Sequence, residues 1–416
     1  MSLTVAINAQ IMPNRGAGGV EAVLIGLVDA LHRLEGPEQY VIVGPTEDPD
    51  WLRPYLGANQ TTVPGPPVRG VKRALRSVKP LVRLTRRGSS WVRNTGQSWP
   101  RLAHSNGFFE ALGCRVVHFP LGQFVVSSVP AVFNPHDLQH VHFPQFFSRV
   151  ERTWKDVTRG AGCKLAHTVT VSSEWVRQDI VRHYGIAPEK IRVIPWAPPT
   201  QVYREPTPAI LEALRHKYEL PHEFALYPAM TWPHKNHIRL LEALALLRDR
   251  RHLQVNLVCT GHQNDFWRHI EHRMTQLGLE KNVRFLGFVP GEDLRGLYRL
   301  AQFMVFPTLF EAAGGPLVEA WQEGTAVACA AITSLPEQVG DAALLFDPRS
   351  VQDISDALAR MATDPSLRET LRQRGFARLP RFNWEATAKA YRAVYRHAAG
   401  CSLTEEDRHL LSGGRT

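Results

Sequence analysis

The chain has 416 residues, of which 44% are hydrophobic, and a formal net charge of +10, which suits two or three folded domains that bind anionic partners. Its five cysteines are odd in number and form no C-x-x-C pair, which argues against a disulfide framework or a zinc site and favours reduced thiols in a cytoplasmic protein. No apolar run approaches the roughly 20 residues of a membrane-spanning helix, and the first residues lack the basic region of a secretory signal, so we expect neither an anchor nor secretion.

The first half of the chain predicts alternating strands and helices. A short strand at residues 3–8 precedes a glycine-rich turn, and residues 19–34 then carry apolar side chains at the i, i+3, i+4, i+7 spacing of a helix. Short continuous apolar runs with helices between them are typical of a parallel sheet that is covered on both faces. Further strands of this kind are expected at residues 40–43, 115–119, 131–134, 168–172 and 191–195.

Residues 69–101 form a basic segment with ten Lys or Arg residues and no acid. Pro80 and Gly88 interrupt it, so two short amphipathic pieces are expected instead of one long helix. We hypothesise that these pieces lie on an anionic membrane surface, at the inner membrane face, and bring the protein to a lipid-linked acceptor. The alternatives are that the segment is a solvated loop or that it binds an anionic soluble acceptor.

A proline-rich stretch at residues 196–208 lacks apolar periodicity and predicts an interdomain linker. A second strand and helix series follows it, and the last strong helix pattern covers residues 383–398. Two doubly wound units joined by such a hinge leave a ligand cleft between the carboxyl ends of their sheets. The strands of the second series are expected at residues 224–230, 253–260, 283–289, 302–306, 326–331 and 343–347.

The stretch LFEAAGGPLVEAW, residues 309–321, places Glu311 and Glu319 on either side of two glycines and Pro316. A helix that begins at Pro316 would turn its N-terminus and its free N–H groups toward the cleft, where they would accept a phosphate. Glu319 in the first helical turn can accept from the vicinal diol of a ribose, and Glu311 can accept from sugar hydroxyls. The alternative is that Glu311 is a surface acid and that Glu319 only complements the helix dipole.

Motifs of one known family occur in order at residues 16–27, 134–147, 171–198, 227–244 and 310–348. Together they resemble glycosyltransferase family 4, the retaining two-domain enzymes of the GT-B fold. The resemblance covers nearly the whole chain except about residues 51–107. It implies an α/β fold of two Rossmann-like, doubly wound parallel-sheet domains: residues 1–198 on the acceptor side, residues 205–382 for the nucleotide sugar, and a helix at 383–400 that packs back on the first domain.

Roles in the second domain carry over from the resemblance position by position. Lys235 matches the lysine that neutralises the leaving diphosphate, Glu311 the acid at the donor sugar and Glu319 the acid at the ribose. The arginine usual five residues before the lysine is replaced by Met230, and Arg239 is the expected substitute for its charge.

The resemblance also implies donor contacts from loops on both sides of the cleft. Gly314 and Gly315 stand in the donor loop, where Ala312 and Ala313 replace part of the usual G-F-G. From the first domain, His136 matches a histidine that faces the donor sugar. Gly18 and Gly19 match the loop that approaches the phosphates. The expected donor-binding residues are therefore Gly18, Gly19, Lys235, Arg239, Glu311, Gly314, Gly315 and Glu319.

The implied activity is a retaining, metal-independent transfer of a hexose, with mannose as a candidate, from a nucleotide-diphosphate sugar to a glycan or lipid-linked acceptor in cell-surface polysaccharide or glycolipid synthesis. Lys235, Glu311 and His136 are the expected catalytic residues, with no cofactor and no metal. A sugar-nucleotide epimerase or a phosphorylase of the same fold is the alternative.

Other functional classes are disfavoured. Glu21 occupies the third glycine position of a dinucleotide fingerprint, where it would repel a pyrophosphate. Asp48 and Asp50 reproduce the D-x-D spacing of metal-dependent transferases but lie in a polar stretch that predicts a turn. No aromatic-flanked basic motif or zinc-finger spacing indicates a nucleic-acid partner.

Overall fold

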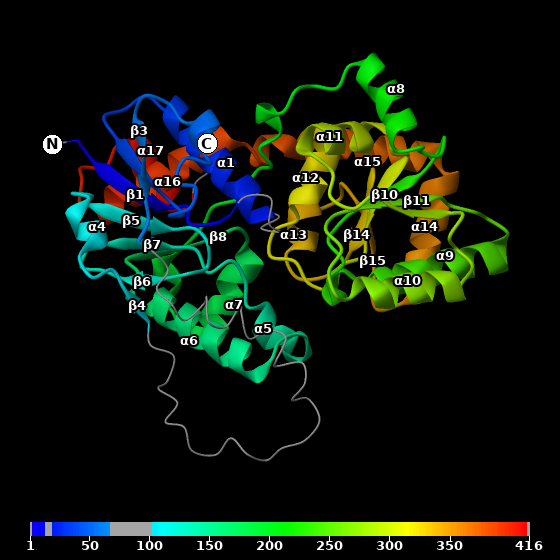
Figure 1. Ribbon diagram of the computed structural model, residues 1–416, viewed down its shortest axis with the longest axis horizontal. Coiled ribbons are helices and arrows are strands. Elements are labelled where there is room, and N and C mark those ends of the chain that lie inside the picture. Colours follow the sequence, from blue (N-terminus) through cyan, green and yellow to red (C-terminus); the bar gives the residue numbers. More distant parts are fainter. Residues whose placement is uncertain (1, 13–18, 67–101, 414–416) are drawn as a thin grey trace, which may run out of the picture.

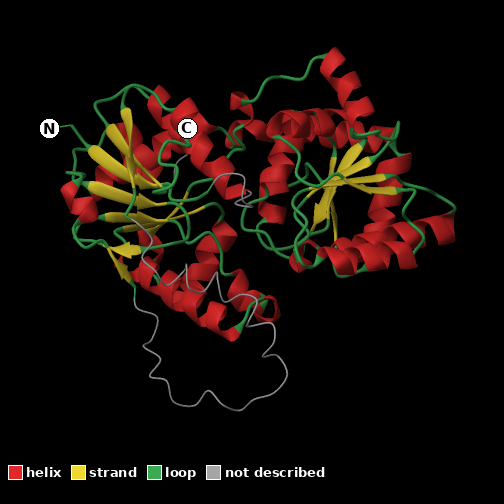
Figure 2. Ribbon diagram, in the orientation of Figure 1, coloured by secondary structure: helices red, strands yellow, loops and turns green. Residues whose placement is uncertain are grey.

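The structure, a computed structural model, describes residues 2–12, 19–66 and 102–413. Within these ranges the chain forms two large parallel sheets, and helices cover both faces of each (Figures 1 and 2). The two α/β units lie side by side, which confirms the predicted GT-B architecture. Gly18 and the basic segment 69–101 fall outside the described residues, so the contacts expected of them stay predictions.

The first sheet has seven strands in the order β3-β2-β1-β5-β7-β8-β9, and all neighbours pair in parallel. Its inner strands are buried apolar runs, as expected of a sheet with two covered faces. The polar edge strand β3 was not predicted because it has no apolar run. The strands are β1 Thr4–Asn8, β2 Gln39–Gly44, β3 Gln60–Pro64, β5 Val116–Phe119, β7 Ala131–Phe133, β8 Thr168–Val171 and β9 Ile191–Val193, with β4 Ala103–His104 and β6 Val125–Val126 forming a separate ribbon.

The second sheet has six parallel strands in the order β12-β11-β10-β13-β14-β15. All six were predicted, and each is shorter than its apolar run. In both sheets the strand order reverses next to the first strand, which is the doubly wound arrangement. The strands are β10 Ala225–Pro228, β11 Leu257–Thr260, β12 Val283–Phe285, β13 Phe303–Phe306, β14 Val327–Ala330 and β15 Leu344–Phe346.

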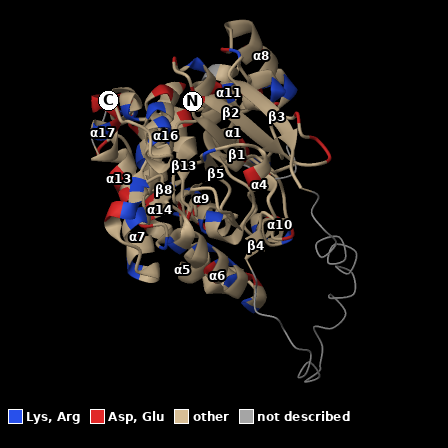
Figure 3. Cartoon of the chain, turned by 90° about the vertical axis from the view of Figure 1, so that its left-hand side faces the viewer, with Lys and Arg blue, Asp and Glu red and all other residues tan. Residues whose placement is uncertain are grey.

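Helices connect these strands, and among the described residues none is long and apolar enough to cross a membrane. Figure 3 shows Lys and Arg at several places along α6 and α7 on the face of the first unit. The α-helices are α1 Gly19–Arg33, α4 Phe108–Ala111, α5 Gln139–His142, α6 Arg149–Leu165, α7 Glu174–Tyr184, α8 Pro208–Lys217, α9 His237–Arg251, α10 Trp267–Gln276, α11 Gly291–Leu300, α12 Gly315–Gln322, α13 Leu335–Val339, α14 Val351–Thr363, α15 Pro365–Arg378, α16 Trp384–Ala398 and α17 Glu405–Leu411. Short 3₁₀ helices are η1 Arg53–Tyr55, η2 Pro144–Phe146, η3 Pro188–Lys190, η4 Thr200–Val202, η5 Pro233–Lys235 and η6 Leu379–Arg381.

Helix α16 lies against the first sheet, although it follows the second sheet in the chain (Figure 1). The Tyr395 hydroxyl shares a hydrogen bond of 2.8 Å with Nδ1 of His118 on β5, and its ring meets Tyr40 of β2. Gly26 of α1 leaves room for the Trp384 indole, because a Cβ at Gly26 would overlap that ring. The chain therefore crosses between the two units twice, once before α8 and once before α16.

Candidate active site

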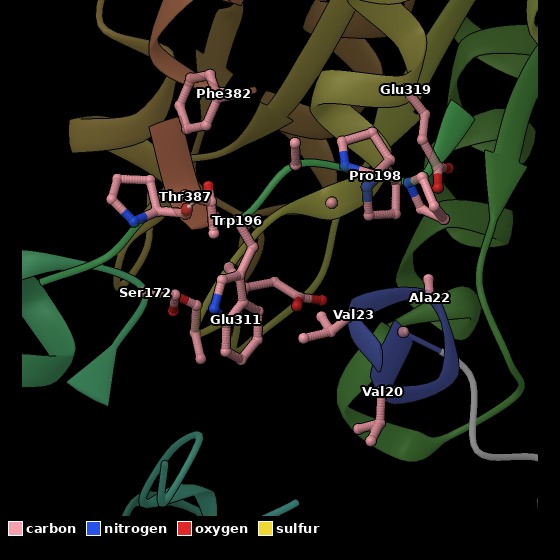
Figure 4. A pocket seen from close by; sticks show the side chains of 18 of the residues that line it. Val20, Ala22, Val23, Ser172, Trp196, Pro198, Glu311, Glu319, Phe382 and Thr387 are labelled. Atoms are coloured by element: carbon pink, nitrogen blue, oxygen red, sulfur yellow. Dashed lines mark hydrogen bonds between the residues drawn. The ribbon is translucent and has the colours of Figure 1, made fainter. Parts of the chain in front are cut away.

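A cavity of about 1790 Å³ lies between the two units. Loops that follow the carboxyl ends of strands in both sheets line it, together with the start of α1 and the segment 191–200. Figure 4 shows Glu311 and Glu319 of the second unit in one view with Val20 and Val23 of α1. The cavity is therefore bounded by both halves of the fold, as predicted for the cleft.

The turn that carries Lys235 follows β10, and Glu311 follows β13, the strand next to β10. These two loops flank the point where the strand order reverses, which is where doubly wound sheets bind ligands. Asn236 fixes the turn. It adopts a left-handed conformation with φ of 63°, and its side-chain amide donates to the carbonyls of Pro307 and Pro348 at 2.9 and 2.8 Å. Lys235 is thereby held beside the end of β13.

The Lys235 ammonium forms an ion pair with the Glu311 carboxylate on the cavity wall. Burial raises the pKa of Glu311, and the charge of Lys235 opposes that rise. The backbone around Glu311 is also fixed, because its carbonyl accepts from the hydroxyls of Thr333 and Ser334 at 2.7 and 3.0 Å. The pair is a preformed arrangement of one cation and one anion in a partly dehydrated site.

Glu319 also lines the cavity but has a neutral partner. The Tyr298 hydroxyl donates to its Oε2 at 2.7 Å, and burial raises the pKa of the Glu319 carboxyl. Glu319 is the fifth residue of α12, so the expectation that it lies in the first turn was wrong. A carboxylate offers about four lone-pair sites, so acceptor capacity remains beyond the bond to Tyr298.

The N-terminus of α12 has fewer free N–H groups than predicted. The Gly314 N–H donates to Oε1 of Gln338 at 2.8 Å, the Leu317 N–H donates to the Gly314 carbonyl at 3.0 Å, and Pro316 has none. The Gly315 N–H makes a longer bond of 3.1 Å to the Ala313 carbonyl. Gly315 and Pro316 line the cavity, whereas Gly314 is buried against leucine side chains behind it. What the terminus offers an anion is mainly the helix dipole.

His136 lines the cavity from the first unit, in the loop after β7. It has a left-handed φ of 64°, and Oδ1 of Asn134 accepts from its N–H at 2.8 Å. Its ring meets Trp196 edge-on at 5.4 Å, and burial lowers its pKa to about 4. Its Nε2 is buried and has no hydrogen-bond partner among the described residues. Burial therefore disfavours the charged form of the ring, and one of its nitrogens is enclosed without a partner among the described residues.

Two of the other expected residues have different positions. Gly19 begins α1 and lines the cavity, with open space where a Cβ would stand. Met230 lines the cavity as well, but Arg239 does not, because its guanidinium turns back to the Asn236 side chain at 3.0 Å. A role for Arg239 at a donor phosphate therefore stays a prediction.

The two units also bond directly beside the cavity. The hydroxyls of Ser172 and Ser173 donate to the Ala312 carbonyl at 3.0 and 3.1 Å. The Glu337 carboxylate accepts from the Glu174 and Trp175 N–H groups at the start of α7, at 2.9 Å each. The loop that carries Glu311 is thus connected to the first unit.

Comparison with known proteins identifies the family. The family model described as Glycosyltransferase Family 4 matches residues 17–200, and the model described as Glycosyl transferases group 1 matches residues 213–378. The O-antigen chain mannosyltransferase B of Escherichia coli is 31% identical over 273 residues, which are 64% of this chain and 70% of that protein. The chain belongs to the group 1 glycosyltransferases.

A further sequence relative matches this glycosyltransferase over a shorter region, and solved structures match it at lower sequence identity. The serotype-specific mannosyltransferase WbdA of Escherichia coli is 34% identical over 180 residues, 43% of this chain but only 22% of that protein. Among solved structures, the Anabaena protein HepE in complex with UDP-glucose has a TM-score of 0.68 at 18% identity, covering 95% of this chain and all of that one. Sucrose-phosphate synthase from Thermosynechococcus elongatus has a TM-score of 0.68 at 19% identity, with 96% of this chain covered and 100% of that chain. These structural likenesses show the shared fold.

Sequence reasoning missed several residues that shape the site of this glycosyltransferase. Tyr298 looks like a core aromatic of α11, and only the fold brings its hydroxyl to Glu319. Gln338 and Thr333 follow β14 and reach back to the Glu311 loop. No spacing rule connects these positions, although the polar residues Thr333 and Ser334, shortly after the apolar run 326–331, could have marked the end of a strand at the cleft.

Proposed function

We propose that the protein is a retaining glycosyltransferase that moves a hexose from a nucleotide-diphosphate sugar to a hydroxyl of a glycan or lipid-linked acceptor. The observation that carries this proposal is the Lys235–Glu311 ion pair at the switch point of the second sheet. It provides one cation for a diphosphate and one anion for sugar hydroxyls, and Glu319 on the same cavity wall supplies a second acceptor.

The proposed donor lies along the wall of the second unit. Its ribose hydroxyls donate to Glu319, its diphosphate meets Lys235 and the N-terminal end of the α12 dipole, and its sugar lies between Glu311 and His136. The unpaired Nε2 of His136 supports this placement, because a buried nitrogen without a partner gains a hydrogen bond when a sugar hydroxyl reaches it. HepE, which shares this fold, was solved with UDP-glucose.

The proposed chemistry is electrostatic. The bond between the anomeric carbon and the diphosphate oxygen breaks, the acceptor oxygen bonds to the same face of that carbon, and the acceptor's proton passes to the departing phosphate oxygen. Lys235 stabilises the negative charge that develops on the diphosphate. Closure of the two units at Ala312 and Glu337 would exclude water that could hydrolyse the donor. No metal is assigned to this step.

Mannose is the first candidate sugar, because both Escherichia coli relatives are named as mannosyltransferases. The name of the first relative also refers to an O-antigen chain, which supports a glycan or lipid-linked acceptor in polysaccharide or glycolipid synthesis. The base of the donor nucleotide is open to test.

The test is a thermal-shift and turnover panel with the full chain. GDP-mannose, UDP-glucose, UDP-galactose and UDP-N-acetylglucosamine are each added with and without EDTA. One donor at 100 times its Kd should add about 2.7 kcal/mol to the free energy of unfolding. With a glycan acceptor, that donor should be consumed, and NMR should show the donor's anomeric configuration in the product. An inverted product would overturn the retaining mechanism, and epimerised donor without transfer would favour the epimerase alternative.

A further inference from the structure

Three side chains of metal-ligating type meet at one point of the first unit. They are His142 at the end of α5, and Asp179 and His183 one turn apart on α7. Among the described residues these form the group of His, Cys, Asp or Glu whose ligand atoms all lie within 4.8 Å of one another. None of the three lines the cavity assigned to the donor, so the proposed transfer leaves this cluster without a role.

The charge arrangement of this cluster is unusual for a simple ion pair. Asp179 is 1% exposed, and both of its oxygens face Nε2 of His142, at 2.9 and 2.8 Å. Nε2 of His183 approaches Oδ1 of the same carboxylate at 3.3 Å. One buried carboxylate is thus opposed by two imidazole nitrogens, although a single imidazole would satisfy an ion pair.

We propose that His142, Asp179 and His183 form a binding site for a divalent transition-metal ion of the Zn²⁺ class. Two imidazoles and one carboxylate are the ligands that Zn²⁺ and its neighbours accept, whereas Mg²⁺ and Ca²⁺ prefer oxygen ligands throughout. Three protein ligands leave a fourth position of a tetrahedral ion for water.

The distances suit this assignment. Zn²⁺–N bonds of about 2.0–2.1 Å in a tetrahedron place neighbouring ligand atoms roughly 3.3 Å apart. The two histidines approach Asp179 at 2.8 and 3.3 Å, so small side-chain rotations would admit an ion. The histidine side chains are 27% and 30% exposed, which leaves a route from solvent, while the carboxylate is held inside.

The site adjoins the contact between the two units. The His142 ring lies 5.5 Å from the ring of Phe310 in the second unit and 5.4 Å from Trp175 at the start of α7. Figures 1 and 3 both show α5 next to α7 on this side of the molecule. A metal ion that fixes the His142 ring against Asp179 also fixes the surface on which Phe310 packs.

The test is a zinc titration of the full, tag-free, metal-stripped chain by calorimetry, with the metal content after dialysis measured by mass spectrometry. The wild type should bind one Zn²⁺ per chain at this site, and its melting temperature should rise with Zn²⁺. His183→Ala should weaken this binding by more than about tenfold, because even residues behind metal ligands typically contribute about 10–100-fold. His183 is partly exposed, so this variant should fold, and circular dichroism checks that it does.

His216→Ala is the matched control. His216 faces Glu212 at 3.1 Å with the same i, i+4 spacing, but it is a surface pair to which the described part of the chain adds no third ligand. The control should bind Zn²⁺ as the wild type does. Co²⁺ gives a second readout, because its visible absorption should indicate four-coordination in the wild type and should be lost in Asp179→Asn. Equal zinc stoichiometry and affinity in the wild type and His183→Ala, or no zinc bound by the wild type, would overturn the proposal.

Discussion

The surroundings of Glu311 and Glu319 differ, although both carboxylates are partly buried on the wall of one cavity and desolvation raises the pKa of each. Glu311 follows a strand and is paired with the full positive charge of Lys235. Glu319 lies on a helix, and the partner that the described residues give it is the neutral Tyr298 hydroxyl. A buried charge is costly unless opposite charge or several donors compensate it.

The charge of Glu311 is thus compensated by an opposite charge, whereas among the described residues the charge of Glu319 is not. The Glu311 region is electrically balanced before any ligand arrives, so a donor has to compete with an existing ion pair there. Among the described residues Glu319 accepts from one neutral hydroxyl and keeps further acceptor capacity, which ribose hydroxyls would use. We therefore expect Lys235 and Glu311 to act mainly on the chemical step and Glu319 mainly on donor binding. Four predictions test this division.

The largest effect is expected from Lys235→Ala. Loss of the cation at the leaving diphosphate should lower kcat by about 10²- to 10³-fold, as removal of a preorganised charge-stabilising group typically does. Lys235→Arg, which keeps the charge, should recover part of the rate in the same steady-state assay. An unchanged kcat in the alanine variant would assign the phosphate to another cation.

Glu319→Ala should act on binding instead. Loss of charge-assisted hydrogen bonds to a ribose diol should weaken donor affinity by about 2–3 kcal/mol, measured by calorimetry with the donor that the panel identifies. Glu319→Gln, which keeps the shape and one acceptor oxygen, should lose less. If Glu319→Ala binds the donor as tightly as the wild type, the ribose role is wrong.

Tyr298→Phe should have a smaller effect, because it removes one hydrogen bond to Glu319 and no charge. We expect the free energy of unfolding to fall by about 1.5 kcal/mol in urea denaturation. Tyr218→Phe is the control, since its hydroxyl donates to Asp293 at the same 2.7 Å but in a more exposed place. Equal losses in the two variants would contradict the view that burial makes the Tyr298 bond matter.

The smallest effect is a pH dependence. Because burial raises the pKa of Glu319, the folded state binds this proton more tightly than the unfolded state does, and stability falls as the pH rises above the usual carboxyl range. Glu319→Gln removes this titration. The stability of the variant relative to the wild type should therefore increase between pH 4.5 and 7 in parallel melting experiments. A difference that stays constant with pH would contradict the assignment.

The fold was predictable because inner strands of a doubly covered parallel sheet are continuous apolar runs. For this reason the apolar runs at residues 302–306 and 326–331 correctly predicted β13 and β14. Strand β3 was not predicted because it is a polar edge strand. The start of α12 was predicted one residue too late, and the helix in fact begins before Pro316, so Glu319 lies beyond its first turn. Periodicity assigns elements to a chain but says nothing of their order in a sheet.

The grouping of the site residues depended on that order. Lys235 and Glu311 are far apart in sequence and meet because β10 and β13 are neighbours, which the resemblance implied and the apolar pattern alone could not. The expectation for Arg239 stays a prediction, because its guanidinium donates to Asn236 and it does not line the cavity in this structure. Tyr298 was missed because its ring belongs to the core and only its hydroxyl reaches the site.

The return of α16 to the first sheet bears on how the chain is made. Ribosomal synthesis delivers residues in order, so the whole second sheet and its helices emerge before the helix that covers β5 and β2. The elements of the second unit are contiguous in the chain and are all made before α16, whereas the first sheet receives its covering helix only afterwards. This differs from the usual course, in which the N-terminal domain is complete and folds first. A chain truncated before residue 384 would therefore keep every strand and helix of the second unit but lack the helix that packs on β5 and β2.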